Sequence, residues 1–440
     1  MFIGMSPAPR LHGPGAQSQL ASLIRAVAAL LIGAMAIPAA GAAEGITLNE
    51  ALTIATDRSR QVPAQEAAAS AAREMSVSAG QLPDPVLKFG VNNLPVTTSE
   101  QFSLGRDFMT MRWVGLMQEL TREDKRKARS ARFEREAEAA EAARNLSLAN
   151  LQRDTAIAWL DRYYKEALRE VLIRERNEAS LQIDAAEAAY RSGRGSQTDV
   201  FAARSSTAQI EERIIQINQQ IATARTILSR WVGDAGDRPM SELPPLDAVR
   251  LTQADLETAL EHHPQIAVMA RQEDMARADA QIARTNQRSD WSVELDYSQR
   301  GPGFSDMVSL NLSIPLQWNQ KNLQNRELAA KLALAEQMRD EREEAVRTHV
   351  AEARSMLQEW RSDRDRLAFY EASLVPLAGE RTKAALAAYR AGPGMLSAVL
   401  EARRAEIDTR VEQIRLEMDT ARLWSQLNYL VPVGHAAPNE

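Results

Sequence analysis

The feature that most constrains this chain is an internal duplication. The segment AAYRSGRGSQTDVFAARSS, which begins at Ala188, returns from Ala387 as AAYRAGPGMLSAVLEARRA, about 200 residues later. Near the start of each half, Leu52 corresponds in the same way to Leu256. The sequence therefore predicts two copies of one structural unit in place of the two or three unrelated domains that 440 residues would otherwise suggest.

The duplicated region is preceded by a segment that is typical of a signal peptide. Arg10 and Arg25 supply basic residues, the run 26–37 is apolar, and Gly41-Ala42-Ala43 offers small residues for cleavage. A transmembrane anchor is the alternative, but this run is shorter than the roughly 18 apolar residues that such an anchor needs. We expect the mature chain to begin near Ala43 or Glu44.

The predicted organisation follows from these boundaries. Residues 234–251 are rich in Pro, Gly and Asp, a composition that indicates a connector. The expected segments are a signal peptide (1–43), a first repeat (44–233), a linker (234–251), a second repeat (252–431) and a C-terminal tail (432–440).

Each repeat shows helical periodicity over most of its length. Residues 122–191 contain neither Gly nor Pro, and apolar side chains recur there at spacings of three or four. A helix of about 70 residues spans roughly 105 Å. Shorter helices are predicted over 47–81 and 196–231, and they would stack end to end beside the long one. The second repeat follows the same plan, with helices expected over 252–288, 321–389 and 395–430.

Short segments between the helices alternate with period two, which predicts one β-hairpin in each repeat. The expected strands cover about 86–93 and 108–120 in the first repeat, and 291–299 and 307–316 in the second. In an exported chain, an apolar-out and polar-in alternation is typical of outer-membrane barrels, which need at least about eight strands. The chain would supply part of a barrel and close it by self-association. Two amphipathic hairpins packed on a soluble helical body are the alternative.

Composition excludes several kinds of chemistry. The chain has no cysteine, so it has no disulfide, thiolate metal site, cysteine nucleophile or lipid-modified cysteine. A net charge of −6 does not indicate nucleic-acid binding. Adjacent residues on a helix point about 100° apart, which argues against a metal site at His262 and His263. The glycine-rich turns lack the Lys-Ser/Thr of a phosphate loop. We predict no enzyme activity, no cofactor and no bound metal.

Several motifs resemble those of the TolC family of outer-membrane efflux channels. They are the opening ITLNEALTIA, the paired YRSG and YRAG segments, and the junctions MQELTREDKRK and LSIPLQWNQKN. The segment LPDPVLKFGVNNLP resembles the heavy-metal efflux branch that works with resistance-nodulation-division pumps. The resemblance implies a mainly α-helical homotrimer in the outer membrane. Three chains would share one β-barrel, and their helices would form a periplasmic conduit, giving a trimeric α/β-barrel tube.

The same resemblance implies where the conduit is narrowest and where a periplasmic adaptor protein docks. The closed tip corresponds to the turns 193–199 and 392–401. Two residues depart from the family pattern: Ala398 stands where an acidic residue is often found, and Gly394 where an arginine is. The alternative for Glu401 is a solvated carboxylate on a helix face, and Glu406 is expected on a wider part of the tube. The implied constriction residues are Asp199, Tyr389 and Glu401, and the implied docking turns contain Gly193, Gly195, Gly392 and Gly394.

The function predicted from these observations is that of a passive exit duct in the outer membrane. The duct would receive metal cations or drugs from an inner-membrane pump through the adaptor. Two other classes remain as alternatives: an exported coiled-coil structural protein, and the periplasmic adaptor itself. An adaptor would need a compact β-rich domain between its helices, and a coiled-coil stalk would lack the two amphipathic hairpins.

Overall fold

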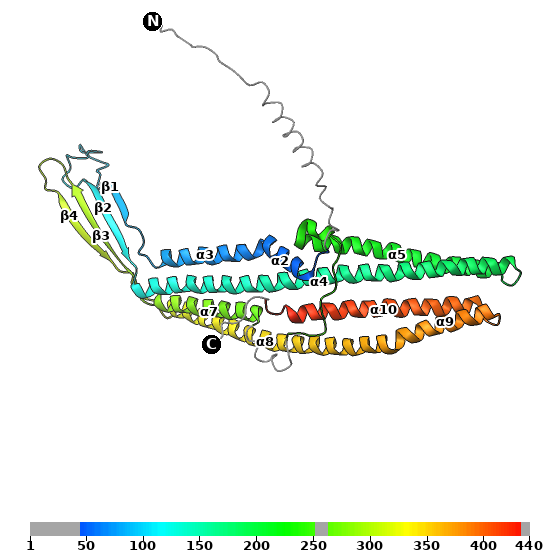
Figure 1. The fold of residues 1–440 in the computed structure, drawn as a ribbon. Helices are drawn as coiled ribbons and strands as arrows, with labels where there is room; N and C mark the ends of the chain where they lie inside the picture. Colours follow the sequence, from blue (N-terminus) through cyan, green and yellow to red (C-terminus); the bar gives the residue numbers. More distant parts are fainter. Residues whose placement is uncertain (1–44, 251–262, 433–440) are drawn as a thin grey trace, which may run out of the picture.

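The computed structural model describes residues 45–250 and 263–432, so the predicted signal peptide and the start of the second repeat lie outside the described residues. The longest helix, α4, contains 69 residues and spans about 104 Å. Shorter helices lie end to end along both of its sides (Figure 1), which confirms the predicted stacking. The helices of the first repeat are α2 (Leu48–Arg58), α3 (Gln61–Ala79), α4 (Glu123–Arg191) and α5 (Gln197–Val232), followed by the 3-10 helix η1 (Gly233–Asp237).

The second repeat has the same plan with one interruption. Its helices are α7 (Pro264–Thr285), α8 (Gln324–Phe369), α9 (Val375–Ala391) and α10 (Leu396–Asn428). The prediction of an unbroken helix over 321–389 is wrong, because a π-helical turn, η3 (Tyr370–Leu374), separates α8 from α9. Pro376 has no N–H and its ring would clash with the carbonyl of Ala372, so the helix widens just before it.

The predicted helix over 47–81 is also divided, into α2 and α3. The break falls at Ser59 and Arg60. In one continuous helix, Pro63 would remove the hydrogen bond to the Ser59 carbonyl. A new helix that begins at Gln61 places this proline in the first turn, where a missing N–H has no cost.

The strands of both repeats join in one four-stranded antiparallel sheet with the order β1-β2-β3-β4. The central pair β2–β3 connects the two repeats, whereas β1 and β4 form the edges. β2 begins later than the alternation suggests because Asp107 accepts hydrogen bonds from the Met109 and Thr110 amides and closes a turn. The strands are β1 (Val86–Asn92), β2 (Met111–Leu120), β3 (Trp291–Gln299) and β4 (Met307–Ser313).

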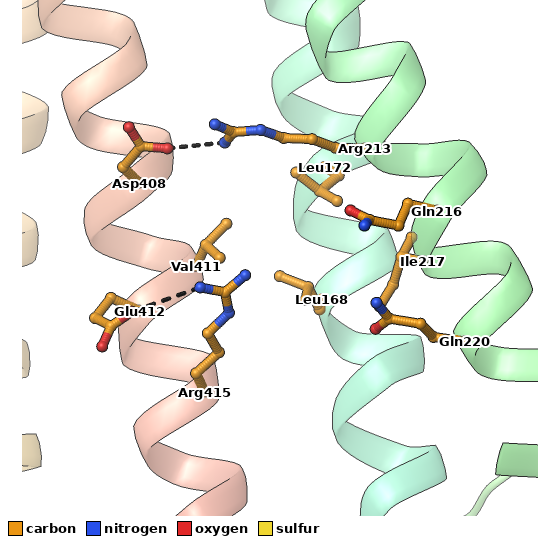
Figure 2. Close-up of a pocket in the computed structure, with 10 residues that line it drawn as sticks. All are labelled: Leu168, Leu172, Arg213, Gln216, Ile217, Gln220, Asp408, Val411, Glu412 and Arg415. Carbon is orange, nitrogen blue, oxygen red and sulfur yellow. Dashed lines mark hydrogen bonds and ion pairs between the residues drawn. The ribbon is translucent and has the colours of Figure 1, made fainter.

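Away from the sheet, the hairpins α4–α5 and α9–α10 are separated by a cavity of about 280 Å³ (Figure 2). Its walls come from α4, α5 and α10, with Leu168 and Val411 among the lining residues. One ion pair crosses it, from the Arg213 guanidinium to the Asp408 carboxylate at 2.8 Å. The two hairpins therefore pack together mainly through α4 and α10.

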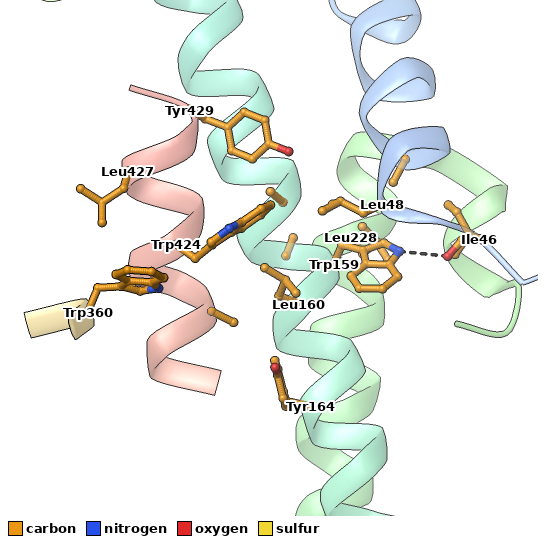
Figure 3. Packing of buried hydrophobic residues seen from close by; sticks show 14 of the residues in the cluster. Ile46, Leu48, Trp159, Leu160, Tyr164, Leu228, Trp360, Trp424, Leu427 and Tyr429 are labelled. Atoms are coloured by element: carbon orange, nitrogen blue, oxygen red, sulfur yellow. Dashed lines mark hydrogen bonds between the residues drawn. The ribbon is translucent and has the colours of Figure 1, made fainter. Parts of the chain in front are cut away.

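The largest apolar core lies near the middle of the helical body and contains residues from both repeats (Figure 3). Trp159 of α4 is fully buried there and donates a hydrogen bond from Nε1 to the Ile46 carbonyl at 3.0 Å. Trp424 and Leu427 of α10 pack against the same core. Among the described helices, none has the length and apolar character needed to cross a membrane.

Candidate channel constriction and membrane-facing sheet

Both helical hairpins end in turns that depend on glycine. Gly193 (φ 73°) and Gly392 (φ 102°) adopt left-handed backbone conformations that side chains with a Cβ disfavour. Open space surrounds the place where a Cβ would stand at either position. These two turns connect the helices of each hairpin, and they lie at the end of the molecule opposite the sheet (Figure 1).

The second glycine of each turn is required for a different reason. A Cβ at Gly394 would lie 2.6 Å from the Tyr389 backbone nitrogen, and one at Gly195 would lie 3.0 Å from the Ala189 Cβ. Both distances are shorter than normal contacts, so a side chain at Gly394 would displace the end of α9.

Asp199 has a local structural role. Its carboxylate accepts a hydrogen bond from the Ser196 amide at 2.9 Å, and its own amide donates to the Ser196 hydroxyl at 3.1 Å. This reciprocal pair is a capping box at the start of α5. Hydrogen bonds from the Ser196 backbone and side chain lower the pKa of Asp199 below its usual value, so the carboxylate stays charged.

Glu401 is exposed on α10, but it is not a free carboxylate. The Arg381 guanidinium of α9 lies 2.9 Å from it, and both side chains are largely exposed. Tyr389 is half-buried and packs against an apolar cluster in which α4, α5 and α10 meet. The structure therefore places Asp199 and Glu401 on different hairpins without direct contact, and Arg381 is a charge at the tip that sequence reasoning missed.

Sequence reasoning also missed a buried ionic network between the hairpins. Glu175 of α4 is almost completely buried, and its two carboxylate oxygens lie 3.2 Å from Arg403 and 3.2 Å from Arg410. Glu406 accepts from both arginines. The side chain of Glu406, a residue expected on a wider part of the tube, is buried in this network. Helical spacing on a single chain does not show which face meets another hairpin.

The sheet has two chemically different faces. On one, apolar side chains are highly exposed, including Phe89 at 79%, Val308 at 70% and Leu310 at 73%. On the other, Lys88 forms an ion pair with Glu294 at 2.8 Å. The exposed apolar face is the arrangement that a lipid-facing sheet requires.

Polar side chains also continue across the second face. Asn311 of β4 donates to Asp296 of β3 at 2.8 Å. A Cβ at Gly115 of β2 would lie 1.9 Å from the Asp296 carboxylate, so the glycine leaves the space that this carboxylate occupies. The polar face is therefore built from specific cross-strand contacts.

Comparisons with known proteins agree with this architecture. Residues 256–431, which make up most of the second repeat, match the family model described as outer membrane efflux protein. No curated protein gives a significant match. The solved structure of the outer-membrane channel OprN is 17% identical, with a TM-score of 0.72 over 88% of this chain and 90% of that one.

Two further solved structures share the fold. The outer membrane protein VceC from Vibrio cholerae is 16% identical, with a TM-score of 0.71 over 87% of this chain and 95% of that chain. The open state of the MtrE outer membrane channel from Neisseria gonorrhoeae is 17% identical, with a TM-score of 0.65 over 87% of this chain and 88% of that chain.

These findings confirm the predicted fold class, two repeats of long antiparallel helices with a β-hairpin each. The family's description also agrees with the predicted outer-membrane location, and it names efflux proteins, not enzymes. The sequence of the second repeat therefore matches the outer membrane efflux proteins, and the fold of the whole chain is similar to that of solved outer-membrane channels, in agreement with the resemblance of its motifs to the TolC family.

Proposed function

We propose that this chain is the outer-membrane exit duct of a tripartite efflux system and that it works as a homotrimer. The observation that carries the proposal is the sheet. One of its faces is apolar and exposed, the other is polar, and its edge strands β1 and β4 each pair on one side only within the described chain. Open edges are not tolerated in lipid, and four strands are too few to close a barrel.

Three copies would resolve both problems. If β4 of one protomer pairs with β1 of the next, every strand gains two neighbours and the ring closes with its apolar face toward lipid. The polar face, with Lys88, Glu294 and Asp296, then lines the lumen. The long helices continue the ring into the periplasm, because about 104 Å of helix is far longer than a bilayer core is thick.

The other expected partners follow from this geometry. The turns at Gly193 and Gly392 point away from the membrane, so they are the surface that a periplasmic adaptor reaches, and the adaptor connects the duct to an inner-membrane pump. The cargo, metal cations or drugs, is selected by that pump. A soluble stalk or adaptor is disfavoured because it would leave the apolar sheet face in water.

The experiment that tests the proposal uses the full-length chain expressed with its own leader. The protein should remain in the membrane after alkaline carbonate extraction, and chemical crosslinking should end at a trimer. The purified protein should conduct ions in planar bilayers. Release by carbonate, or crosslinking that ends at a dimer, would exclude the trimeric duct.

A further inference from the structure

A second, larger cavity of about 750 Å³ lies where the sheet meets the helices. Its lining comes from the ends of β2, β3 and β4, from the segment 286–290, and from the beginnings of α4 and α8. Glu119, Ser292 and Ser313 form one row across three strands on the polar face of the sheet. The cavity therefore opens on the side that, in the proposed function, is the lumen.

The cavity contains charges that the protein itself does not neutralise. Lys125 and Asp290 form an ion pair with each other at 2.7 Å. Arg129, Arg288, Glu119 and Glu327 also line the cavity, and none of these four forms an ion pair with another residue in the described ranges. Two guanidinium groups and two carboxylates are thus available to a ligand in the same space.

Two amide side chains, Asn286 and Gln324, also line the cavity. Their Oδ1 and Oε1 atoms are buried away from solvent, so these two oxygen atoms do not face a ligand in the cavity. The groups that a ligand meets there are therefore the charged side chains of Arg129, Arg288, Glu119 and Glu327.

We propose that this junction cavity binds a small amphoteric organic ion, one that carries both a carboxylate and an ammonium group. Arg129 and Arg288 would donate to the carboxylate, because guanidinium groups match carboxylate geometry. Glu119 and Glu327 would accept from the ammonium group. The proposal rests on the proposed function, because the cavity would then be a binding site on the path along which cargo passes from the helical conduit into the barrel.

Ligand-observed NMR with the purified full-length protein in detergent tests the chemistry with three matched probes. They are 6-aminohexanoate, hexanoate, which lacks the ammonium group, and hexylammonium, which lacks the carboxylate. We expect 6-aminohexanoate to bind about tenfold more tightly than either probe with one charge, because each deleted group removes charged hydrogen bonds. Equal affinity for all three probes would overturn the proposal.

Substitutions then test the location. Arg288→Gln and Glu327→Gln should each weaken binding of 6-aminohexanoate by about tenfold. The matched control is Arg326→Gln, since Arg326 is exposed in the same turn of α8, has no ion pair with a described residue, and does not line the cavity. The same weakening in the control, or none in the two cavity variants, would place any binding elsewhere.

The conductance of the same preparation in planar bilayers separates this inference from the function on which it rests. If the channel conducts and the probe does not bind, the cavity proposal fails and the duct stands. If the protein neither conducts nor forms a trimer, the proposed function itself fails, and a cavity that still distinguishes the three probes supports a binding site outside any transport path.

Discussion

Arg403 of α10 and Glu175 of α4 form an ion pair at 3.2 Å in which the Glu175 side chain is only 1% exposed. Burial raises the pKa of Glu175, and the charges of Arg403 and Arg410 partly offset this effect. The first-repeat counterpart of Arg403 is Arg204, which pairs with Glu187 inside its own hairpin, where both side chains are partly exposed. The arginine at this duplicated position therefore joins the two hairpins in the second repeat, whereas in the first repeat it forms only a partly exposed ion pair within one hairpin.

This asymmetry predicts different costs for the same substitution. Arg403→Met leaves the buried Glu175 carboxylate with less compensation and should lower stability by about 3 kcal/mol. Arg204→Met removes an exposed pair and should cost about 0–1 kcal/mol. Melting temperatures of the purified variants provide the measurement. Equal losses in both variants would show that the buried network does not stabilise the packing of the hairpins.

The second prediction concerns the apolar face of the sheet. Leu310→Arg places a charge on the face proposed to contact lipid, which costs about 2–4 kcal/mol near the middle of the bilayer, and should reduce the amount of assembled protein. Asn311→Arg is the matched control, because its side chain lies on the polar face. Quantification of protein in the outer-membrane fraction is the readout. Normal assembly of the Leu310 variant would contradict lipid contact there.

The third prediction separates docking from folding at the tip. Gly392→Val introduces strain of about 1–2 kcal/mol through its left-handed backbone, but nothing obstructs the new side chain. Export should be lost while membrane-inserted trimer remains near normal. Gly394→Val should lower trimer yield as well, because its Cβ would collide with the Tyr389 backbone. Unchanged export by both Gly392→Val and Gly193→Val would show that the turns at the tip do not take part in docking to the adaptor.

The sequence alone predicted the repeat, the helices and the strand alternation, because these depend on local periodicity. It also placed the turns correctly, since the left-handed backbone at Gly193 and Gly392 favours glycine. The π-helical turn depends on Pro376, and the corresponding long helix of the first repeat, residues 122–191, contains no proline. A prediction that the second repeat copies the first therefore misses this turn.

Contacts between hairpins were beyond sequence reasoning. Glu175 and Arg403 are separated by 228 residues, and nothing in the helical spacing shows that they meet. The partner of Glu401 was missed for the same reason, because Arg381 precedes the turn and approaches only when α9 and α10 fold back on each other. Such pairs depend on the crossing geometry of helices, which a single sequence does not encode locally.

The fourth prediction is a pH effect beside the π-helical turn. Burial and the nearby Glu371 carboxylate raise the pKa of Glu417, which also faces Tyr164. The neutral form is thus favoured in the folded protein, and this contribution to stability, complete below the ordinary pKa of 4.5, is lost as the pH rises through the raised value. Glu417→Gln should therefore raise the melting temperature at neutral pH and change it little near pH 4.

Melting temperatures between about pH 4 and pH 8 check this difference. Glu412→Gln provides the control, since Glu412 is exposed on the same helix and lies near Arg415. A gain for Glu417→Gln that is equal at every pH would mean that packing, and not the ionisation of Glu417, sets the local stability.

The last prediction concerns charge at the proposed constriction. Threefold symmetry would turn each tip residue into a ring, and fixed charge acts most strongly on ions where a water-filled tube is narrow. Because Arg381 and Glu401 are paired, their rings oppose each other. Glu401→Gln should therefore lower the preference for cations in planar bilayers, and Arg381→Gln should raise it. Asp199→Asn should have a smaller effect on selectivity, because the Asp199 carboxylate is held by the Ser196 cap.

The size of the two shifts distinguishes this arrangement from a general change in surface charge, because a charge far from the narrowest part of the tube has little effect on ion preference. Glu412→Gln is the control, because Glu412 lies on the same helix as Glu401 and lines the cavity between α4, α5 and α10. Reversal potentials in a salt gradient give the ion preference of each variant. If Glu401→Gln and Arg381→Gln shift it in the same direction, or not at all, selectivity lies elsewhere. The acidic strand residues Glu294 and Asp296 are then the next candidates, and of these Asp296 is favoured, because Lys88 already neutralises Glu294.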